Sequence, residues 1–212
     1  MQSGSFSPAS HSAAPGIILM ICDTNPRESI LQMLADCADE AGCVLRVIEP
    51  MTNTEDWKQW LYSARFTYCS FKKQYSRIFL CGKGQGAIPA CILASQYQSD
   101  GMILLFPSFR PAFSKRLRSV FETLFRNSAN RFIPMLRLCA QRMYAITCPL
   151  LMISSSSEKE SDPRWINSRC SSLSVQSVRV PDPGAGQLPE ESVSLIKPAL
   201  SAFLDHPARQ EG

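Results

Sequence analysis

The stretch from residue 77 to residue 94, RIFLCGKGQGAIPACILA, constrains the fold more than any other part of the chain. Its apolar run at 78–81 predicts a short buried strand. The next five residues, GKGQG at 82–86, contain three glycines, and glycine is the residue that sharp turns tolerate best. Small and apolar residues then follow from Ala87 onward, which is typical of a buried helix. The stretch therefore predicts a strand, a sharp turn and a helix in direct succession.

Other segments repeat this alternation of short apolar runs with helical periodicity. Further strands are expected at 16–22, 44–48, 101–106, 148–153 and 175–180, and helices at about 30–38, 54–75, 165–173 and 190–204. The first strand is apolar on both faces, as a central parallel strand should be. Six strands alternating with helices predict an α/β fold, with a mostly parallel six-stranded sheet and helices on both faces.

Length and composition predict one domain. A chain of 212 residues with 45% hydrophobic and 19% charged residues suits a single globular core. Residues 1–16 are small and polar without the features of a signal peptide, and we expect a disordered tail followed by one domain at 17–212. No apolar run reaches the ~20 residues of a membrane span. Nine cysteines without a C-x-x-C pair indicate a reducing compartment, so we expect a cytoplasmic protein without a metal site.

The alternation pauses at about 108–147, and this insertion carries the only strong charge asymmetry that we identify from the sequence. Between Arg110 and Arg142 it holds eight arginines and lysines against the single acid Glu122, interleaved with apolar residues. Basic amphipathic helices of this kind can contact an anionic surface or a protein partner. The same pattern is equally typical of a helix that covers a core and turns a charged face to water. No nucleic-acid-binding motif accompanies the patch, so nucleic acid is not an expected partner.

The series of elements resembles the α/β-hydrolase family, most closely its small bacterial carboxylesterase and monoglyceride-lipase branch. The resemblance covers about residues 17–205. It is carried by GKGQG in place of the nucleophile elbow G-x-S-x-G, by the CPLLMI strand (148–153) and by the PDPGAGQLPEE loop (181–191) before the last helix. A tryptophan-bearing helix that begins near Asp56 precedes the elbow, as in that branch. The resemblance implies that the insertion at 108–147 is a helical cap over the sheet.

Carried over to this chain, the resemblance implies a catalytic triad that has lost its nucleophile and its base. Gly84 holds the serine place and Gln187 the histidine place, and an amide cannot take a proton from a hydroxyl near neutral pH. The acid place falls on or near Glu158, which a solvated loop explains equally well. The segment at Cys22 and Asp23 holds one oxyanion-hole place. The backbone amide of Gln85 holds the other.

Other residues near the elbow leave alternatives open. Cys81 lacks a histidine partner, because His11 and His206 lie near the chain ends, and we interpret it as structural. Lys83 could meet an anion at the helix N-terminus or could be a solvated turn residue. Gln85 and Gln187 could bind a ligand or merely fill the places of lost residues.

The sequence therefore favours a pseudo-enzyme without cofactors. It would bind a small acyl or apolar ligand, or a protein partner, through Cys22, Asp23, Lys83, Gly84, Gln85 and Gln187. The alternative is an active carboxylesterase-type hydrolase that uses a non-standard site. Fold alone cannot decide between the two, because function resides in the site.

Overall fold

The structure is a computed structural model that describes residues 16–22, 28–48, 57–109, 126–156, 166, 170, 174–181 and 188–205. The strands are β1 (Gly16–Cys22), β2 (Cys43–Ile48), β3 (Ile78–Lys83), β4 (Gly101–Leu105), β5 (Leu150–Ser155) and β6 (Val175–Val180). The longer helices are α1 (Glu28–Glu40), α2 (Trp57–Lys72), α3 (Ala87–Gln96), α5 (Arg126–Arg142) and α7 (Glu190–Asp205). Two single 3₁₀ turns, η1 (Gly84–Gly86) and η2 (Met143–Ala145), precede α3 and follow α5.

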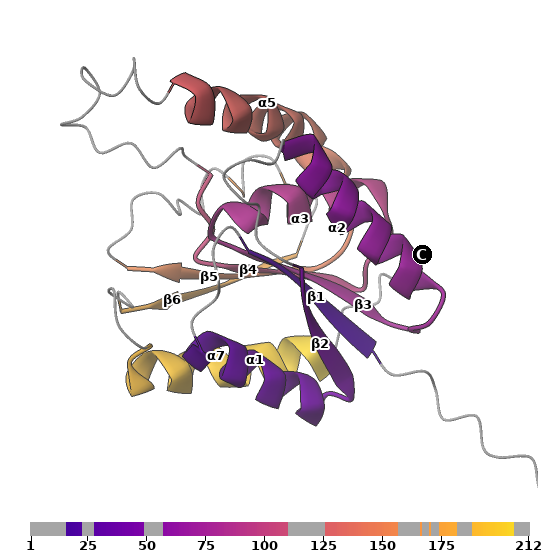
Figure 1. Cartoon of the computed structure of the whole chain (residues 1–212). Helices are drawn as coiled ribbons and strands as arrows, with labels where there is room; N and C mark the ends of the chain where they lie inside the picture. The colour runs from indigo at the N-terminus through magenta and orange to yellow at the C-terminus, as the bar shows by residue number, and fades with distance from the viewer. Residues whose placement is uncertain are drawn as a thin grey trace, which may run out of the picture.

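The six strands form one fully parallel sheet in the order β2-β1-β3-β4-β5-β6. The helices cover both faces of the sheet (Figure 1): α2, α3 and α5 lie on one face, and α1 and α7 lie on the other. The prediction of an α/β fold with a parallel six-stranded sheet and helices on both faces is confirmed. The chain order reverses between β1 and β3, and this is the point at which open parallel sheets place their ligands.

The central strands are buried on both faces, which explains why they are continuously apolar. Alternate residues of β1 belong to different cores: Ile17 and Leu19 face α2, α3 and α5, whereas Ile18 and Met20 face α1 and α7. Helix α3 is the innermost helix, since every residue from Ala87 to Ala94 is buried. It packs between the sheet and the helices α2 and α5, which cover it (Figure 1).

The expected elements form close to their expected places, with two differences at the carboxyl edge of the sheet. Strand β3 does not end at Cys81 but continues to Lys83, because Lys83 still pairs with Cys22 of β1 and Leu105 of β4. Strand β5 runs to Ser155, two residues beyond the expected end, because its last residues still pair with β6. Polar residues can end a buried strand when a neighbouring strand satisfies their backbone groups.

Some expectations fall wholly or partly outside the described residues. These are the tail, of which only Gly16 is described as the first residue of β1, the start of the helix expected at 54–75, and most of the helix expected at 165–173. In the insertion at 108–147, residues 126–145 form α5 and η2, the described residues 108–109 and 146–147 are not helical, and the segment 110–125 lies outside the described residues. None of the described helices is both long and apolar enough to cross a membrane.

Candidate functional site

The turn between β3 and α3 has a backbone conformation that strongly favours glycine. Gly84, the first residue after β3, has a φ of 59°, in the left-handed region that side chains with a β-carbon rarely adopt. The chain therefore turns sharply from strand to helix within the single 3₁₀ turn Gly84–Gly86. Gly84, for which the family resemblance predicts the serine place, contributes only backbone to this turn.

The two flanking glycines are required by close packing. A β-carbon on Gly82 would lie 2.5 Å from the Cα of Ala87, at the start of α3. A β-carbon on Gly86 would lie 2.1 Å from the carbonyl oxygen of Ile21 in β1. Real β-carbons do not approach backbone atoms so closely, so α3 can begin directly against the ends of β1 and β3 only if both residues are glycine.

Strand register brings four of the predicted site residues to one place at the carboxyl edge. Cys22 pairs with Lys83, and Gly84 and Gln85 follow Lys83 directly. This is the point where the chain order of the strands reverses, which is where open parallel sheets place their ligands. Asp23, Glu158 and Gln187, the other predicted site residues, lie outside the described residues.

Leu188, the residue after Gln187, is the first described residue after the segment 182–187. Leu188 is buried, and its backbone N–H donates a 3.5 Å hydrogen bond to the hydroxyl oxygen of Ser29 in the first turn of α1. This contact ties the residue after Gln187 to the helix that follows β1 along the chain.

The thiols near the elbow are buried rather than reactive. Cys22 and Cys81 are fully buried and belong to the core on the α1 and α7 face of the sheet. Burial raises the pKa of the Cys81 thiol well above its usual value, the neighbouring Cys22 adds to this effect, and the positive charge of Lys83 opposes it only in part. A protonated thiol is a poor nucleophile, which agrees with the structural interpretation of Cys81.

Two serines lie near this edge: Ser108, which the sequence did not indicate, and Ser154, which belongs to the serine run 154–157 that the sequence left as an alternative source of a nucleophile. The backbone N–H of Ser108, which lies beyond β4, donates a 2.9 Å hydrogen bond to the carbonyl oxygen of Gly84. Ser154, near the end of β5, is 1% exposed, and its hydroxyl has no hydrogen-bond partner among the described residues. Neither residue belongs to a sequence motif, and only the folded sheet brings them to the carboxyl edge.

No described residues form a group of three or more histidine, cysteine, aspartate or glutamate side chains that could hold a metal ion. Both histidines, His11 and His206, lie outside the described residues. The arrangement at the elbow thus consists of backbone groups, the side chains of Lys83 and Gln85, and buried thiols. Backbone N–H groups of this kind can stabilise negative charge on a bound carbonyl or carboxylate oxygen.

Comparison with known proteins finds similar structures but no similar sequences. No protein-family model matches the chain, and no curated protein matches it significantly. A monoacylglycerol lipase from Paleococcus ferrophilus has a similar structure, with a TM-score of 0.67, 9% identity and coverage of 92% of this chain and 97% of the lipase.

Two further solved structures agree with this likeness. A structure reported for the metagenome-derived lipolytic enzymes LipS and LipT has a TM-score of 0.66 at 12% identity and covers 91% of this chain and 94% of its own. The esterase domain of a Rhodothermus marinus protein has a TM-score of 0.62 at 9% identity and covers 94% and 90%. At such identities a shared structure demonstrates the fold and not the activity. The chain has the α/β-hydrolase fold.

Proposed function

We propose that this chain is a catalytically degenerate α/β-hydrolase-fold protein that binds a small acyl or apolar ligand, or a protein partner, at the carboxyl edge around Gly84. One observation carries the proposal. The turn keeps the glycines and the φ of 59° of a nucleophile elbow, yet Gly84 at its tip has no side chain. A covalent acyl-enzyme needs a nucleophilic side chain, so this position can bind but cannot form the intermediate.

Two further features support binding rather than turnover. The residue at the histidine place is Gln187, whose amide cannot act as a general base near neutral pH. Cys81, the nearest thiol along the chain, is fully buried with a pKa raised well above its usual value. Removal of both nucleophile and base leaves only the contributions of binding and oxyanion stabilisation to any remaining catalysis.

A second candidate function is an active ester hydrolase with a non-standard nucleophile. Ser108 favours this candidate, because its backbone N–H is bonded to the carbonyl oxygen of Gly84 and it brings a hydroxyl group to the neighbourhood of the elbow. Ser154 adds a buried hydroxyl without a described partner at the end of β5. Either serine would still need a base, and the described residues contain no histidine.

The test is hydrolysis of nitrophenyl esters from acetate to octanoate by the wild type and by a Gly84→Ser, Gln187→His double variant. The matched control is Gly42→Ser with Gln187→His, because Gly42 is also a positive-φ glycine, at 65°, but ends the turn after α1. We expect no turnover above buffer for the wild type and the control. A gain of activity in the Gly84 double variant alone supports a preserved acyl-binding edge.

Turnover by the wild type would contradict the proposal. Loss of that turnover in Ser108→Ala or Ser154→Ala, with Ser156→Ala as the exposed control, would then identify the nucleophile. Calorimetric titration of the wild type with octanoate separates the two binding alternatives. Heat of binding that Gly84→Val abolishes favours an acyl ligand, and its absence leaves the protein partner as the proposal.

A further inference from the structure

The outward face of helix α2 is an exposed surface that folding does not require. Its inward side is fully packed, with Trp60 and Ala64 at 3% and 0% exposure. Tyr62 and Phe66, one turn apart on the outward side, are 69% and 65% exposed. Two large aromatic side chains left in water one helical turn apart suggest a surface that meets a partner.

Cationic residues surround these aromatic side chains. Seven exposed residues lie on the outward side of α2, if Lys73, directly after the helix, is included. At 3.6 residues per turn, they fall within roughly 120° of the helix circumference. They are Lys58, Tyr62, Arg65, Phe66, Cys69, Lys72 and Lys73, and we call them the α2 face. The guanidinium group of Arg65 also lies over the ring of Tyr97, 5.7 Å from its centroid, which holds this cation beside the helix.

The charges of the molecule are sorted between the two helical layers. Helix α2 and the next residue, Lys73, contain four lysines and arginines and no acid, α3 has no charged residue, and α5 contains four arginines and no acid. Helices α1 and α7, on the other side of the sheet, hold four and three acids against the single cation Lys197. The nearest acids to α2 along the chain are Glu55 and Asp56, before its first residue.

This separation extends the asymmetry beyond the insertion at 108–147, to which the sequence analysis confined it. Helix α5 lies beside α2 in the same layer (Figure 1) and exposes Arg137 and Arg142 there. A molecule with one basic and one acidic layer acquires a preferred orientation in front of an anionic surface, with α2 and α5 toward that surface.

We propose that the α2 face docks onto the anionic headgroup region of a lipid bilayer. Aromatic rings, above all tyrosine with its apolar ring and polar hydroxyl, suit the boundary between headgroups and acyl chains. Lysine and arginine bury their aliphatic stems and keep their charges at the phosphate level. Tyr62 and Phe66 therefore enter the boundary region while Arg65, Lys72 and Lys73 contact anionic headgroups.

A second copy of the chain matches the α2 face less well. Its acidic layer would attract the cations, but among its described residues Leu195 is the large apolar side chain exposed on α1 and α7, at 47%. A single leucine offers Tyr62 and Phe66 little apolar surface to bury. The inference is independent of the proposed function, because none of these residues belongs to the elbow.

The test is flotation of the full chain with phosphatidylcholine vesicles that contain or lack phosphatidylserine. We expect binding only to the anionic vesicles, with a strong decrease as salt is raised. Lys72→Gln, Lys73→Gln should weaken binding about fivefold for each lysine, and Tyr62→Ser, Phe66→Ser should weaken it about tenfold. All four positions are exposed, so the folded state should be retained, which circular dichroism checks.

Matched controls remove the same groups elsewhere. Arg46→Gln, Arg179→Gln removes two exposed cations from the edge strands β2 and β6, and Leu195→Ser removes an exposed apolar side chain from α7. Both should bind like the wild type. Cys69 is the one exposed cysteine of nine, so an environment-sensitive fluorophore attached there reports the contact directly, through a blue shift on addition of anionic vesicles.

Three outcomes would overturn the proposal. The first is absence of vesicle binding, or equal binding to neutral vesicles. The second is binding that the control variants reduce as much as the α2 variants do. The third is that vesicles remain unbound while the chain self-associates, or binds polyglutamate or RNA, in a way that depends on Tyr62 and Phe66. The α2 face would then bind a second copy of the chain, an acidic protein or a nucleic acid, respectively.

Discussion

Gly86 at the start of α3 and Ile21 in β1 meet so closely that a β-carbon on Gly86 would lie 2.1 Å from the carbonyl oxygen of Ile21. The obstacle is backbone on both sides, so no side-chain rotation can relieve it. We therefore expect Gly86→Ala to destabilise the fold by about 3 kcal/mol, at the upper end of the usual cost of overpacking. Urea unfolding measures the change.

Gly42 provides the control for this substitution, because nothing lies within 4 Å of a β-carbon built there. Its φ of 65° alone should make Gly42→Ala cost about 1–2 kcal/mol. If Gly86→Ala cost no more than Gly42→Ala, α3 would have room to move away from β1, and the close approach would not be a requirement of the fold.

Gly84 should resist any residue with a β-carbon, although less strongly than Gly86. Its φ of 59° is strained for such residues, and we expect Gly84→Ser to lower the free energy of unfolding by about 1–2 kcal/mol. The ester-hydrolysis test therefore starts from a less stable protein, and thermal unfolding of Gly84→Ser should be measured beside it. An unchanged melting temperature would mean that the turn relaxes away from the positive φ.

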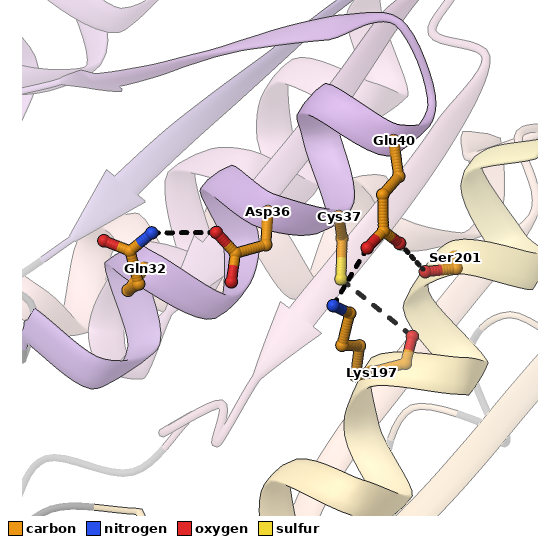
Figure 2. A network of polar contacts seen from close by, with 6 residues as sticks. All are labelled: Gln32, Asp36, Cys37, Glu40, Lys197 and Ser201. Carbon is orange, nitrogen blue, oxygen red and sulfur yellow. Dashed lines mark hydrogen bonds and ion pairs between the residues drawn. The ribbon is translucent and has the colours of Figure 1, made fainter.

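The helices α1 and α7 are joined by a polar network around one ion pair (Figure 2). Lys197 Nζ lies 2.9 Å from Glu40 Oε1, and the hydroxyl of Ser201 donates a 3.3 Å hydrogen bond to Glu40 Oε2. Hydrogen bonding and the charge of Lys197 lower the pKa of Glu40 below 4.5, and the same contact raises the pKa of Lys197 above 10.5.

These two shifts define a pH window for the contribution of the pair to stability. It is fully present between the two ordinary pKa values, is lost as pH falls through the lowered pKa of Glu40, and is lost as pH rises through the raised pKa of Lys197. We expect Glu40→Gln to be slightly less stable than the wild type within the window and equal to it outside. The pair is exposed, so the difference should shrink in high salt.

Asp39→Asn controls for the loss of one exposed negative charge on the same helix. The free energy of unfolding of both variants and of the wild type is measured by chemical unfolding across the pH range. A deficit in Glu40→Gln that persisted below the lowered pKa of Glu40, or an equal deficit in Asp39→Asn, would assign the effect to the helix itself and not to the contact with Lys197.

The buried Tyr68 should make the stability of the fold depend on pH in the alkaline range. Its hydroxyl donates a hydrogen bond to the carbonyl oxygen of Gln98, and burial, with the nearby charge of Asp100, raises its pKa to about 12. Because the folded state holds this proton more tightly than the unfolded state, stability should fall as pH rises from 10 toward that value. Tyr68→Phe should cost about 1 kcal/mol at neutral pH and remove part of the alkaline loss.

Tyr62→Phe is the control, because Tyr62 is exposed on the opposite side of α2. Unfolding by urea at neutral and alkaline pH compares the three proteins. Should Tyr62→Phe change the alkaline profile as much as Tyr68→Phe, the dependence would not arise from burial of Tyr68.

Cys69 should be the one thiol of the folded protein that reacts rapidly with a thiol reagent. The other eight cysteines are buried, and burial raises the pKa of thiols such as Cys81 and Cys148. We expect one fast equivalent with a disulfide reagent in the native protein and nine in denaturant. The fast phase should vanish in Cys69→Ser, and a second fast thiol, above all Cys81, would reopen the question of a cysteine nucleophile.

Local patterns were sufficient to predict the fold of this chain. Continuous apolar runs such as 16–22 and 101–105 are typical of strands buried between two layers of helices. The glycines of GKGQG indicate a sharp turn between strand and helix, because a β-carbon at Gly82 or Gly86 would clash with backbone. Patterns were less accurate at the strand ends. Lys83 and Ser155 lie in strands because neighbouring strands pair with them, which no local propensity records.

For the candidate site too, some features could be predicted from the sequence and others depend on the tertiary structure. From the sequence, the resemblance of GKGQG to the nucleophile elbow predicts that Gly84 holds the serine place, and this remains a prediction. Only the tertiary structure joins Ser108 to Gly84, places Gly86 against Ile21 and sorts the basic and acidic helices onto opposite faces of the sheet. These relationships depend on parallel pairing and helix packing between segments far apart in the chain, and the physical forces that set them act through space and not along the sequence.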